Sequence, residues 1–387
     1  MRRLKVFIKQ YFFPAGILSG TIIGAGMFAL PRVFEETGWV AGLFYLIFFG
    51  VVFSLVHLMY ADIILRSGGK PHFAYYAKKY LGTWSFGAAI IISTVGFFLI
   101  LTVFLTLSAS FLKLILPIDE LAAVLIFGSL ASLAVFFEIK KVAFLELVIT
   151  LGMILIVAIL FFLGLGDTGN FILGNALGNF GWEVLILPFG PILFALAGRP
   201  AVLSVVAYFR EVRLPISLMK PAIVGGTLAP IFVYILFILG IVGLSRNISS
   251  DAVSGLLGSS YPILVSVGFL GLTAIFSTYI LVGRSIRDSL IYDLDFPRWH
   301  AALLVVALPI MFYFAGLNNF FYLVGIIGGI FVSCDALLVV LIWQALNHSG
   351  KERKLITRLG SKTAFIIFLV IFLGLAYEIF SLLSWVR

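Results

Sequence analysis

The sequence has little charge and almost no cysteine. Only 11% of its 387 residues are Asp, Glu, Lys or Arg, whereas 62% are hydrophobic. Soluble domains are about 25% charged and about 45–50% apolar, so no soluble fold of this length could bury the apolar side chains that are present. The single cysteine, Cys334, excludes a disulfide within the chain.

Motifs for catalysis within a membrane are absent as well. The sequence contains no HExxH zinc motif, no paired intramembrane aspartates and no credible Ser/His dyad. Repeated filter motifs and rings of charge, which line ion channels, are also missing. We therefore predict that the protein is neither an enzyme nor a channel.

What the chain has instead is a series of apolar runs of about 20 residues, each long enough to cross a hydrocarbon core of about 30 Å. The polar residues between these runs predict an all-α polytopic membrane protein with eleven transmembrane helices. The expected spans are 13–34, 40–66, 84–116, 120–138, 142–165, 183–209, 218–244, 260–290, 299–316, 319–346 and 364–385.

The basic residues lie in alternate connections between these spans. Of the 26 Lys and Arg residues, 21 fall in six connecting segments, whereas the opposite connections carry stretches such as EETG and PID. The positive-inside rule predicts a multi-pass protein of the cell membrane with its N-terminus in the cytoplasm and its C-terminus outside. Topology thus explains the net charge of +9, and we expect membrane lipid rather than nucleic acid as a partner.

Two spans contain residues that interrupt helices. The first contains GTIIGAGMFALP (20–31), in which closely spaced glycines indicate either a helix–helix contact or a helix broken within the membrane. The sixth contains LPFGPILFALAGRPAVLSVVAYFRE (187–211), with three prolines and two glycines between 188 and 200. Because proline removes an amide donor and clashes with the preceding turn, we expect the sixth helix to unwind around 194–199. This second interruption favours a break in the first.

The interrupted spans are numbers one and six, which divides the chain into two halves of five spans. An odd number of spans in each half gives the halves opposite orientations, hence an inverted repeat. Such paired interruptions indicate the midplane site of a secondary transporter. We expect a single transmembrane domain (1–387) with a first repeat at 13–165, a second at 183–346, and an extra helix at 364–385.

These residues carry a family resemblance. GTIIGAGMFALP resembles the first-helix motif of the amino acid–polyamine–organocation superfamily, and is most similar to the aromatic/hydroxy amino acid permeases and the wider amino acid/auxin permease branch. PFGPILFALAGRPAVLSVVAYFREVR is similar to their sixth helix and LTAIFSTYILVGRSIRDSLIYDL to their eighth. The resemblance implies the five-plus-five fold of the bacterial leucine transporter and amino acid symport with Na⁺ or H⁺ by alternating access.

The resemblance also implies a substrate site at the two breaks. Backbone amides around Ala25 and Gly26 would bind the substrate carboxylate, as helix N-termini bind anions, and carbonyls of the sixth helix would accept from the amino group. Apolar side chains around them favour a neutral hydrophobic or aromatic amino acid. An organic amine, a nucleobase, or a non-transporting amino acid sensor are the alternatives. The candidate substrate residues are Thr21, Ile22, Gly24, Ala25, Gly26, Met27, Thr94, Phe97, Phe189, Phe194, Ala195, Leu196 and Gly198.

A cation site is implied in the same way. Three carbonyls and two hydroxyls would coordinate Na⁺, and three of these residues are spaced i, i+3 and i+4 on one helix face. The alternative is that the two hydroxyls bond to their own helix. The fifth span has no lysine within it, unlike some proton-coupled relatives, which favours Na⁺ over H⁺; no other cofactor is expected. The cation ligands are Gly20, Ile23, Ala274, Ser277 and Thr278.

Charged residues within spans are candidates for gates, since charge is costly there. Arg199 follows the sixth-helix break and needs a partner, and Asp335 lies at comparable depth in span ten, so we predict an Arg199–Asp335 pair as an inner gate. Asp62 resembles the family's acidic residue near the end of span two, where we expect it to pair with a basic loop residue. His57 lies in the same span, five residues before Asp62.

Overall fold

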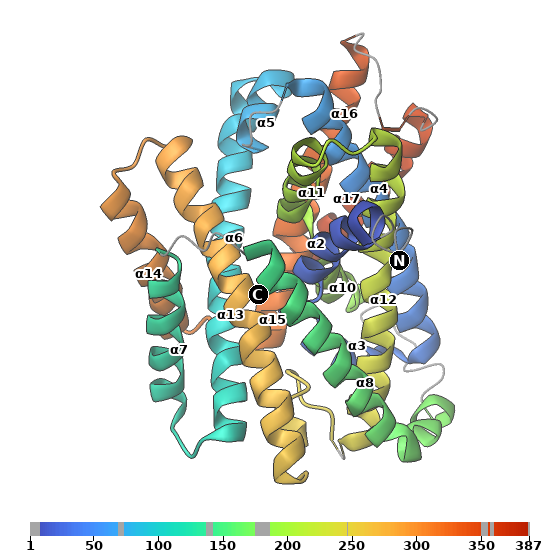
Figure 1. The fold of residues 1–387 in the computed structure, drawn as a ribbon, viewed down its shortest axis with the longest axis vertical. Helices are drawn as coiled ribbons and strands as arrows, with labels where there is room; N and C mark the ends of the chain where they lie inside the picture. Colours follow the sequence, from blue (N-terminus) through green and yellow to red (C-terminus); the bar gives the residue numbers. More distant parts are fainter. Residues whose placement is uncertain are drawn as a thin grey trace.

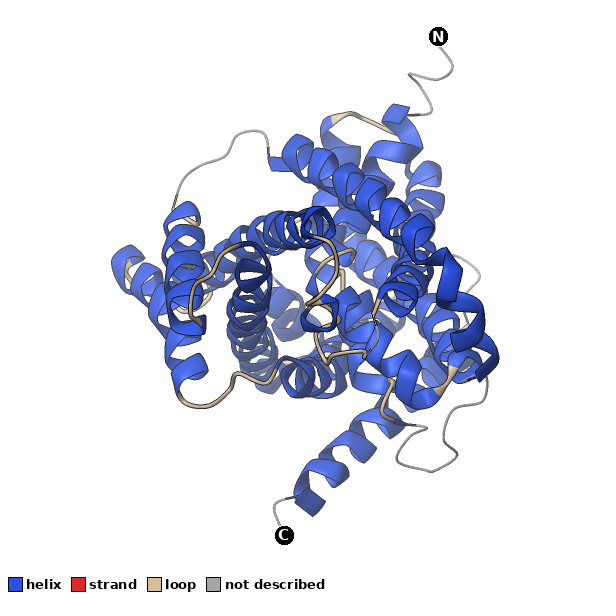
Figure 2. Cartoon of the chain, turned by 90° about the horizontal axis from the view of Figure 1, so that it is seen from below, coloured by secondary structure: helices blue, strands red, loops and turns tan. Residues whose placement is uncertain are grey.

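The computed structural model describes residues 8–68, 73–136, 142–174, 186–245, 247–349, 355–356 and 360–385. Over these ranges the chain consists of helices and connecting loops, without a strand (Figure 2). Up to residue 174 the helices are η1 (Ile8–Phe12), α2 (Phe13–Ile22), η2 (Ala25–Ala29), α3 (Leu30–Thr37), α4 (Trp39–Ser67), α5 (Phe73–Leu81), α6 (Thr83–Ile115), α7 (Glu120–Ala134) and α8 (Val142–Gly174).

The second part of the described chain is helical as well, and its last helix, α17, follows the predicted second repeat. They are α10 (Phe189–Leu196), α11 (Arg199–Glu211), η3 (Ile216–Leu218), α12 (Met219–Leu244), η4 (Ser254–Leu256), α13 (Tyr261–Tyr292), α14 (Arg298–Phe314), α15 (Phe320–Ile326), η5 (Ile327–Val332), α16 (Ser333–His348) and α17 (Ser361–Trp385).

Most of these helices are long and apolar enough to cross a membrane. Within the described ranges, eight segments meet that condition, and a bent pair near the N-terminus brings the number to nine. Helices α7 and α14 are apolar but shorter, with 15 and 17 residues. Every span expected from the sequence overlaps one of these long segments or one of the two shorter helices. The prediction of an all-helical multi-pass protein is therefore confirmed. The count of eleven spans stays a prediction.

The first span is broken as predicted. Helix α2 ends at Ile22, where Ile23 N donates to Ser19 O, and Gly24 is extended (φ −145°, ψ −150°). The chain resumes in the 3₁₀ turn η2 and then in α3, and the two segments are bent by 50°. Pro31 lies in the first turn of α3, where its missing N–H has no helical acceptor to lose.

The sixth span is also interrupted, over only two residues. Helix α10 ends at Leu196, Ala197 and Gly198 are non-helical, and α11 starts at Arg199. Pro200 lies in the first turn of α11, and Pro188 directly precedes α10. The interruption is therefore shorter than the predicted 194–199, because the prolines occupy helix starts that tolerate them.

The broken helices lie at the centre of the bundle (Figure 1). Helix α5 lies across the end shown at the top, beside α6 and α16, while α7 and α14 pack together against α6 and α13 at one side. Helix α17 packs on α16 and η5 and leaves Phe365, Phe372 and Phe380 exposed. Such an uncovered apolar face suits contact with lipid acyl chains.

Candidate functional site

A central cavity of about 110 Å³ lies where the two helix breaks meet. Helices α4, α6, α11, α13, η5 and α16 complete its wall, which is mostly apolar. Eight of the thirteen predicted substrate residues line it: Thr21, Ile22, Gly24, Ala25, Gly26, Phe97, Phe194 and Gly198. The structure thus brings both interrupted segments, more than 160 residues apart in the sequence, to one cavity.

The two breaks are in direct backbone contact. A Cβ on Gly26 would lie 2.5 Å from Ala195 Cα and 3.0 Å from Ala195 N, so only glycine permits this approach. Tyr234 of α12, which is fully buried, holds the same junction. Its hydroxyl is 2.6 Å from Ile22 O and 2.7 Å from Ala195 O, so the single phenol proton is shared between a carbonyl at the end of α2 and another near the end of α10.

The other five predicted substrate residues lie away from this cavity wall. Met27 and Leu196 are fully buried in the packed core, and Ala195 contacts Gly26 instead. The Phe189 ring packs edge-on against Phe49, with centroids 5.5 Å apart, and lies over Gly374 of α17. Thr94 lines a second cavity. Every residue of α10 is buried, so apolarity alone did not indicate which side chains face the cavity.

The predicted pair of Arg199 and Asp335 forms at one end of the central cavity. Arg199 Nε is 2.6 Å from Asp335 Oδ2, and Arg199 Nη2 is 3.2 Å from Ser93 Oγ. The guanidinium also lies over the Phe73 ring, 4.0 Å from its centroid. Arg199 is the first residue of α11, where a helix dipole disfavours a cation, so its position depends on Asp335 and not on the helix.

A second, wider cavity of about 410 Å³ begins on the other side of Arg199. It extends along α6, α11 and α13 toward α5 and the C-terminal end of α13, with Asp288 and Asp293 in its wall. Arg199 and Ser93 line both cavities. The Arg199–Asp335 pair therefore stands between the central cavity and an opening at the α5 end of the bundle.

The five predicted cation ligands meet at a small separate cavity. Gly20 of α2 and Ile23, directly after that helix, line it together with Ala274, Ser277 and Thr278 of α13. Thr278 Oγ1 donates to Ala274 O at 3.0 Å, which is the bond to its own helix that the alternative expected for this hydroxyl; its lone pairs remain for a cation. Thr150 of α8 also lines this cavity and adds a third hydroxyl that the sequence analysis did not include. An all-oxygen set of carbonyls and hydroxyls fits a hard cation such as Na⁺.

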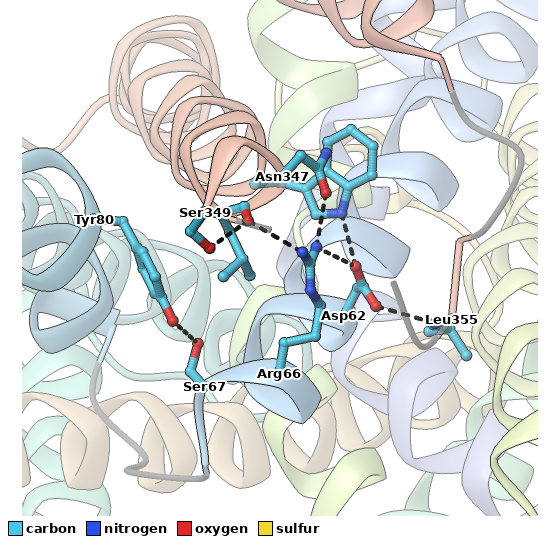
Figure 3. Close-up of polar contacts among 9 residues, drawn as sticks. Asp62, Arg66, Ser67, Tyr80, Asn347, Ser349 and Leu355 are labelled. Atoms are coloured by element: carbon cyan, nitrogen blue, oxygen red, sulfur yellow. Dashed lines mark hydrogen bonds and ion pairs between the residues drawn. The ribbon is translucent and has the colours of Figure 1, made fainter. Parts of the chain in front are cut away.

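Asp62 belongs to a different cluster, shown in Figure 3. Its carboxylate is 3.2 Å from Arg66 Nη1 and accepts from Trp343 Nε1 and from Leu355 N, both at 3.0 Å. Arg66 also donates to Asn347 Oδ1 at 2.8 Å. Arg66 lies on α4 itself, one turn from Asp62; the expected pairing of Asp62 with a basic loop residue stays a prediction. The cluster joins α4 to α16 and to the segment that follows it, outside the walls of the two larger cavities.

His57 is the main residue of the cavity wall that the sequence analysis did not assign to the site. It lies on α4, is 1% exposed, and lines the central cavity. Its Nδ1 is 3.0 Å from Thr227 Oγ1 of α12. The available signal was a histidine within an apolar span; its partner is 170 residues away in the sequence, which no local pattern indicates.

Comparison with known proteins agrees with this architecture. Residues 8–380 match the sequence model of the tryptophan/tyrosine permease family. The solved structure of MhsT in complex with L-phenylalanine has a TM-score of 0.69 at 16% identity, covering 93% of this chain and 98% of that one. A manganese transporter of Eremococcus coleocola, in complex with an aromatic bis-isothiourea substituted compound, has a TM-score of 0.60 at 13% identity, covering 97% and 88%. These two likenesses show a shared fold.

Among curated proteins, spore germination protein B2 of Bacillus subtilis (strain 168) is 30% identical over 100 aligned residues. That alignment spans 22% of this chain and 27% of the curated relative, so it covers only about a quarter of that relative. The family match, by contrast, extends over nearly the whole chain. The chain belongs to the tryptophan/tyrosine permease family, and is a multi-pass membrane transporter of amino acids and not an enzyme.

Proposed function

We propose that the chain is a secondary active transporter that carries an aromatic or other neutral hydrophobic amino acid together with a cation, by alternating access. The observation that carries this proposal is the meeting of two helix breaks at one cavity, with Gly26 against Ala195. Interrupted helices expose backbone groups at membrane depth, which is tolerated where they line a cavity. Such groups suit the charged ends of an amino acid.

In this proposal the substrate carboxylate binds amides of the first break, at Ala25 and Gly26. These are the first amides of a helical segment and have no helical acceptor, and the helix N-terminus favours an anion. The amino group then binds carbonyls at the end of α10. Phe194 O and Ala195 O each accept one hydrogen bond already, from Ala197 N and from Tyr234, so each keeps one lone pair for the ligand.

The apolar wall supports an aromatic or hydrophobic side chain as cargo. Phe97 and Phe104 of α6, Phe194 of α10 and Phe331 of η5 line the cavity. Aromatic pairs in edge or offset contact add stability beyond their buried area. The family description and the L-phenylalanine complex of a protein with the same fold support the same class of substrate.

We assign Na⁺ as the coupling ion, held by the oxygens of Gly20, Ile23, Ala274, Ser277 and Thr278, with Thr150 as a further hydroxyl. Proton coupling is the second candidate, and Glu378 of α17 is the observation that favours it. Its carboxyl group packs over Gly329, within a helix long and apolar enough to span the membrane, and intramembrane acids are common proton carriers.

The packing supports the proposed repeat. Helix α2 of span one packs on α8 of span five, and α10 of span six packs on η5 of span ten, where Gly190 and Gly328 bring the backbones together. We therefore propose one transmembrane domain (1–387) of eleven spans, with leucine-transporter-like five-helix repeats at 13–165 and 183–346 and an extra helix at 364–385.

We further propose that Arg199 and Asp335 form the inner gate, and that Asp62 braces α4 against α16 at the same end. The positive-inside rule assigns the α5 end to the cytoplasm, with the N-terminus inside and the C-terminus outside. The wide second cavity then leads from the gate to the cytoplasm.

A thermal-shift screen of the purified protein tests substrate and ion together, because bound ligand stabilises a protein by mass action. The twenty amino acids are screened in NaCl or KCl at two pH values. We expect tryptophan, tyrosine, phenylalanine or leucine to raise the melting temperature most, and more in NaCl. Stabilisation by lysine or glutamate in preference to these would contradict the substrate, and equal shifts in NaCl and KCl would contradict Na⁺ coupling.

A further inference from the structure

The hydrogen bonds of His57 define which of its ring nitrogens carries a proton. Thr227 Oγ1 lies 2.9 Å from Ile223 O, to which it donates, and 3.0 Å from His57 Nδ1. A hydroxyl has one proton to donate, so toward His57 it acts as the acceptor, and Nδ1 carries the N–H. In a neutral imidazole the other nitrogen, Nε2, is then an acceptor.

This acceptor has no partner among the described residues. His57 Nε2 is buried without a hydrogen bond, while the histidine lines the central cavity. Nδ1 is turned toward α12, so Nε2 lies at another edge of a ring that is itself part of the cavity wall. A doubly protonated ring would place a second positive charge beside Arg199 in a mostly apolar cavity, and burial of unpaired charge is costly. The neutral form with a free acceptor fits the surroundings better.

The remaining question is which ligand group would donate to this nitrogen. The charged ends of an amino acid are accounted for by backbone groups at the two breaks, whereas α4 is continuous at His57 and presents only side chains. The other buried acceptor of the wall without a partner in the described chain, Asp335 Oδ1, belongs to a carboxylate that is already paired with Arg199. What remains for His57 is a donor on the side chain of the substrate.

We infer that His57 Nε2 accepts a hydrogen bond from the side chain of the cargo, either the indole N–H of tryptophan or the phenol O–H of tyrosine, and so selects these amino acids over phenylalanine. The inference rests on the proposed function and names a specificity-determining residue within it. Phenylalanine would fill the same space and leave a buried acceptor unpaired, which is unfavourable. Thr227 is the positioning residue, because it fixes the tautomer.

The test uses two ligand pairs that differ only in the donor. Tyrosine is compared with phenylalanine, and tryptophan with 3-benzothienylalanine, in which sulfur replaces the indole N–H. Binding is measured on the purified full chain, in wild type and in His57→Leu, His57→Gln and Val51→Ala. Val51 lies on the same helix, is half exposed on its outer face and lines none of the cavities described above, so its substitution serves as the control.

We expect wild type to prefer the donor-bearing member of at least one pair by about tenfold, as one hydrogen bond to a buried acceptor allows. His57→Leu reduces that ratio to about one, and Val51→Ala leaves it unchanged. His57→Gln keeps part of it through an amide oxygen near the position of Nε2. Where His57→Leu does not fold, Thr227→Val gives the same readout, and we expect a reduced ratio.

Several results overturn the inference. Wild type that binds amino acids with both ratios near one overturns it and leaves the proposed function intact. So does a His57→Leu or Thr227→Val variant whose ratios equal those of wild type. Wild type that binds none of the four ligands overturns the inference, and wild type that also binds no other neutral hydrophobic amino acid overturns the proposed function with it.

Discussion

Replacing Gly26 by alanine tests the contact between the two helix breaks. The added methyl carbon would lie 2.5 Å from Ala195 Cα and 3.0 Å from Ala195 N, so the breaks must move apart by roughly 1 Å to reach ordinary van der Waals contact. Such overpacking costs about 1–3 kcal/mol. Tyr234 bonds to carbonyls on both sides, and weakening one of these bonds adds about 1 kcal/mol.

The assay is thermal unfolding of the unliganded protein, followed by tryptophan binding. We expect Gly26→Ala to lower the melting temperature by at least about 2 °C and to weaken binding by about tenfold or more, since about 1.4 kcal/mol of strain at the site corresponds to that factor. Gly24→Ala is the control for stability, because the nearest atoms to its Cβ, Thr21 O and Thr278 Oγ1, are 3.7 and 3.8 Å away.

Comparing the two variants shows whether the close contact of Gly26 with Ala195, and not the loss of a glycine as such, causes the effect. If only Gly26 is restricted by Ala195, the unliganded Gly24→Ala variant melts within about 1 °C of wild type. Equal melting temperatures for the two variants, together with wild-type tryptophan affinity in Gly26→Ala, would refute the argument that backbone contact at Gly26 forms the site.

Three further substitutions test other parts of the site. Tyr234→Phe removes the donor shared by two buried carbonyls, so we expect a loss of about 1–3 kcal/mol as a lower melting temperature; a wild-type value would contradict the role of this hydroxyl. Asp335→Asn leaves Arg199 without its counter-charge, and we expect Arg199→Gln added to it to restore part of the lost stability; strictly additive losses would argue against a coupled pair. Thr278→Val removes a proposed Na⁺ ligand and should raise the Na⁺ concentration for half-maximal substrate binding by about tenfold, whereas the exposed Ser266→Ala on the same helix should not; equal Na⁺ dependence in both would exclude Thr278 as a ligand.

The interruptions could be predicted because glycine and proline act locally. Gly24 and Pro31 in the first span, and Gly198 and Pro200 in the sixth, mark helix ends by backbone geometry alone, and both breaks are present. The Arg199–Asp335 contact was also predictable, since a charge at membrane depth requires a partner.

The direction of apolar side chains could not be predicted in the same way. Met27, Phe189 and Leu196 lie in segments that are apolar on every face, so periodicity carries no information about which face meets the cavity. Phe189 turns toward α17 because Gly374 leaves room for its ring there. Arg66, four residues after Asp62, has the spacing of an i,i+4 pair, so this contact could have been predicted from the sequence.

Long-range hydrogen bonds were beyond the sequence as well. His57 and Thr227, or Tyr234 and the carbonyls of Ile22 and Ala195, come together only when α12 packs against α2 and α4. Each of these contacts joins a side chain of α12 to a different part of the chain. No single stretch of the sequence therefore contains both partners of any of these hydrogen bonds.

The proposed function requires that the cavity carries an amino acid across the membrane. Counterflow tests it most directly: proteoliposomes preloaded with unlabelled tryptophan are diluted into radiolabelled tryptophan, and the label inside is followed with time. We expect a transient accumulation of label above its equilibrium level, abolished by excess unlabelled substrate outside. Saturable tryptophan binding by the same protein preparation without any such accumulation would contradict transport and indicate a binding protein with a transporter fold.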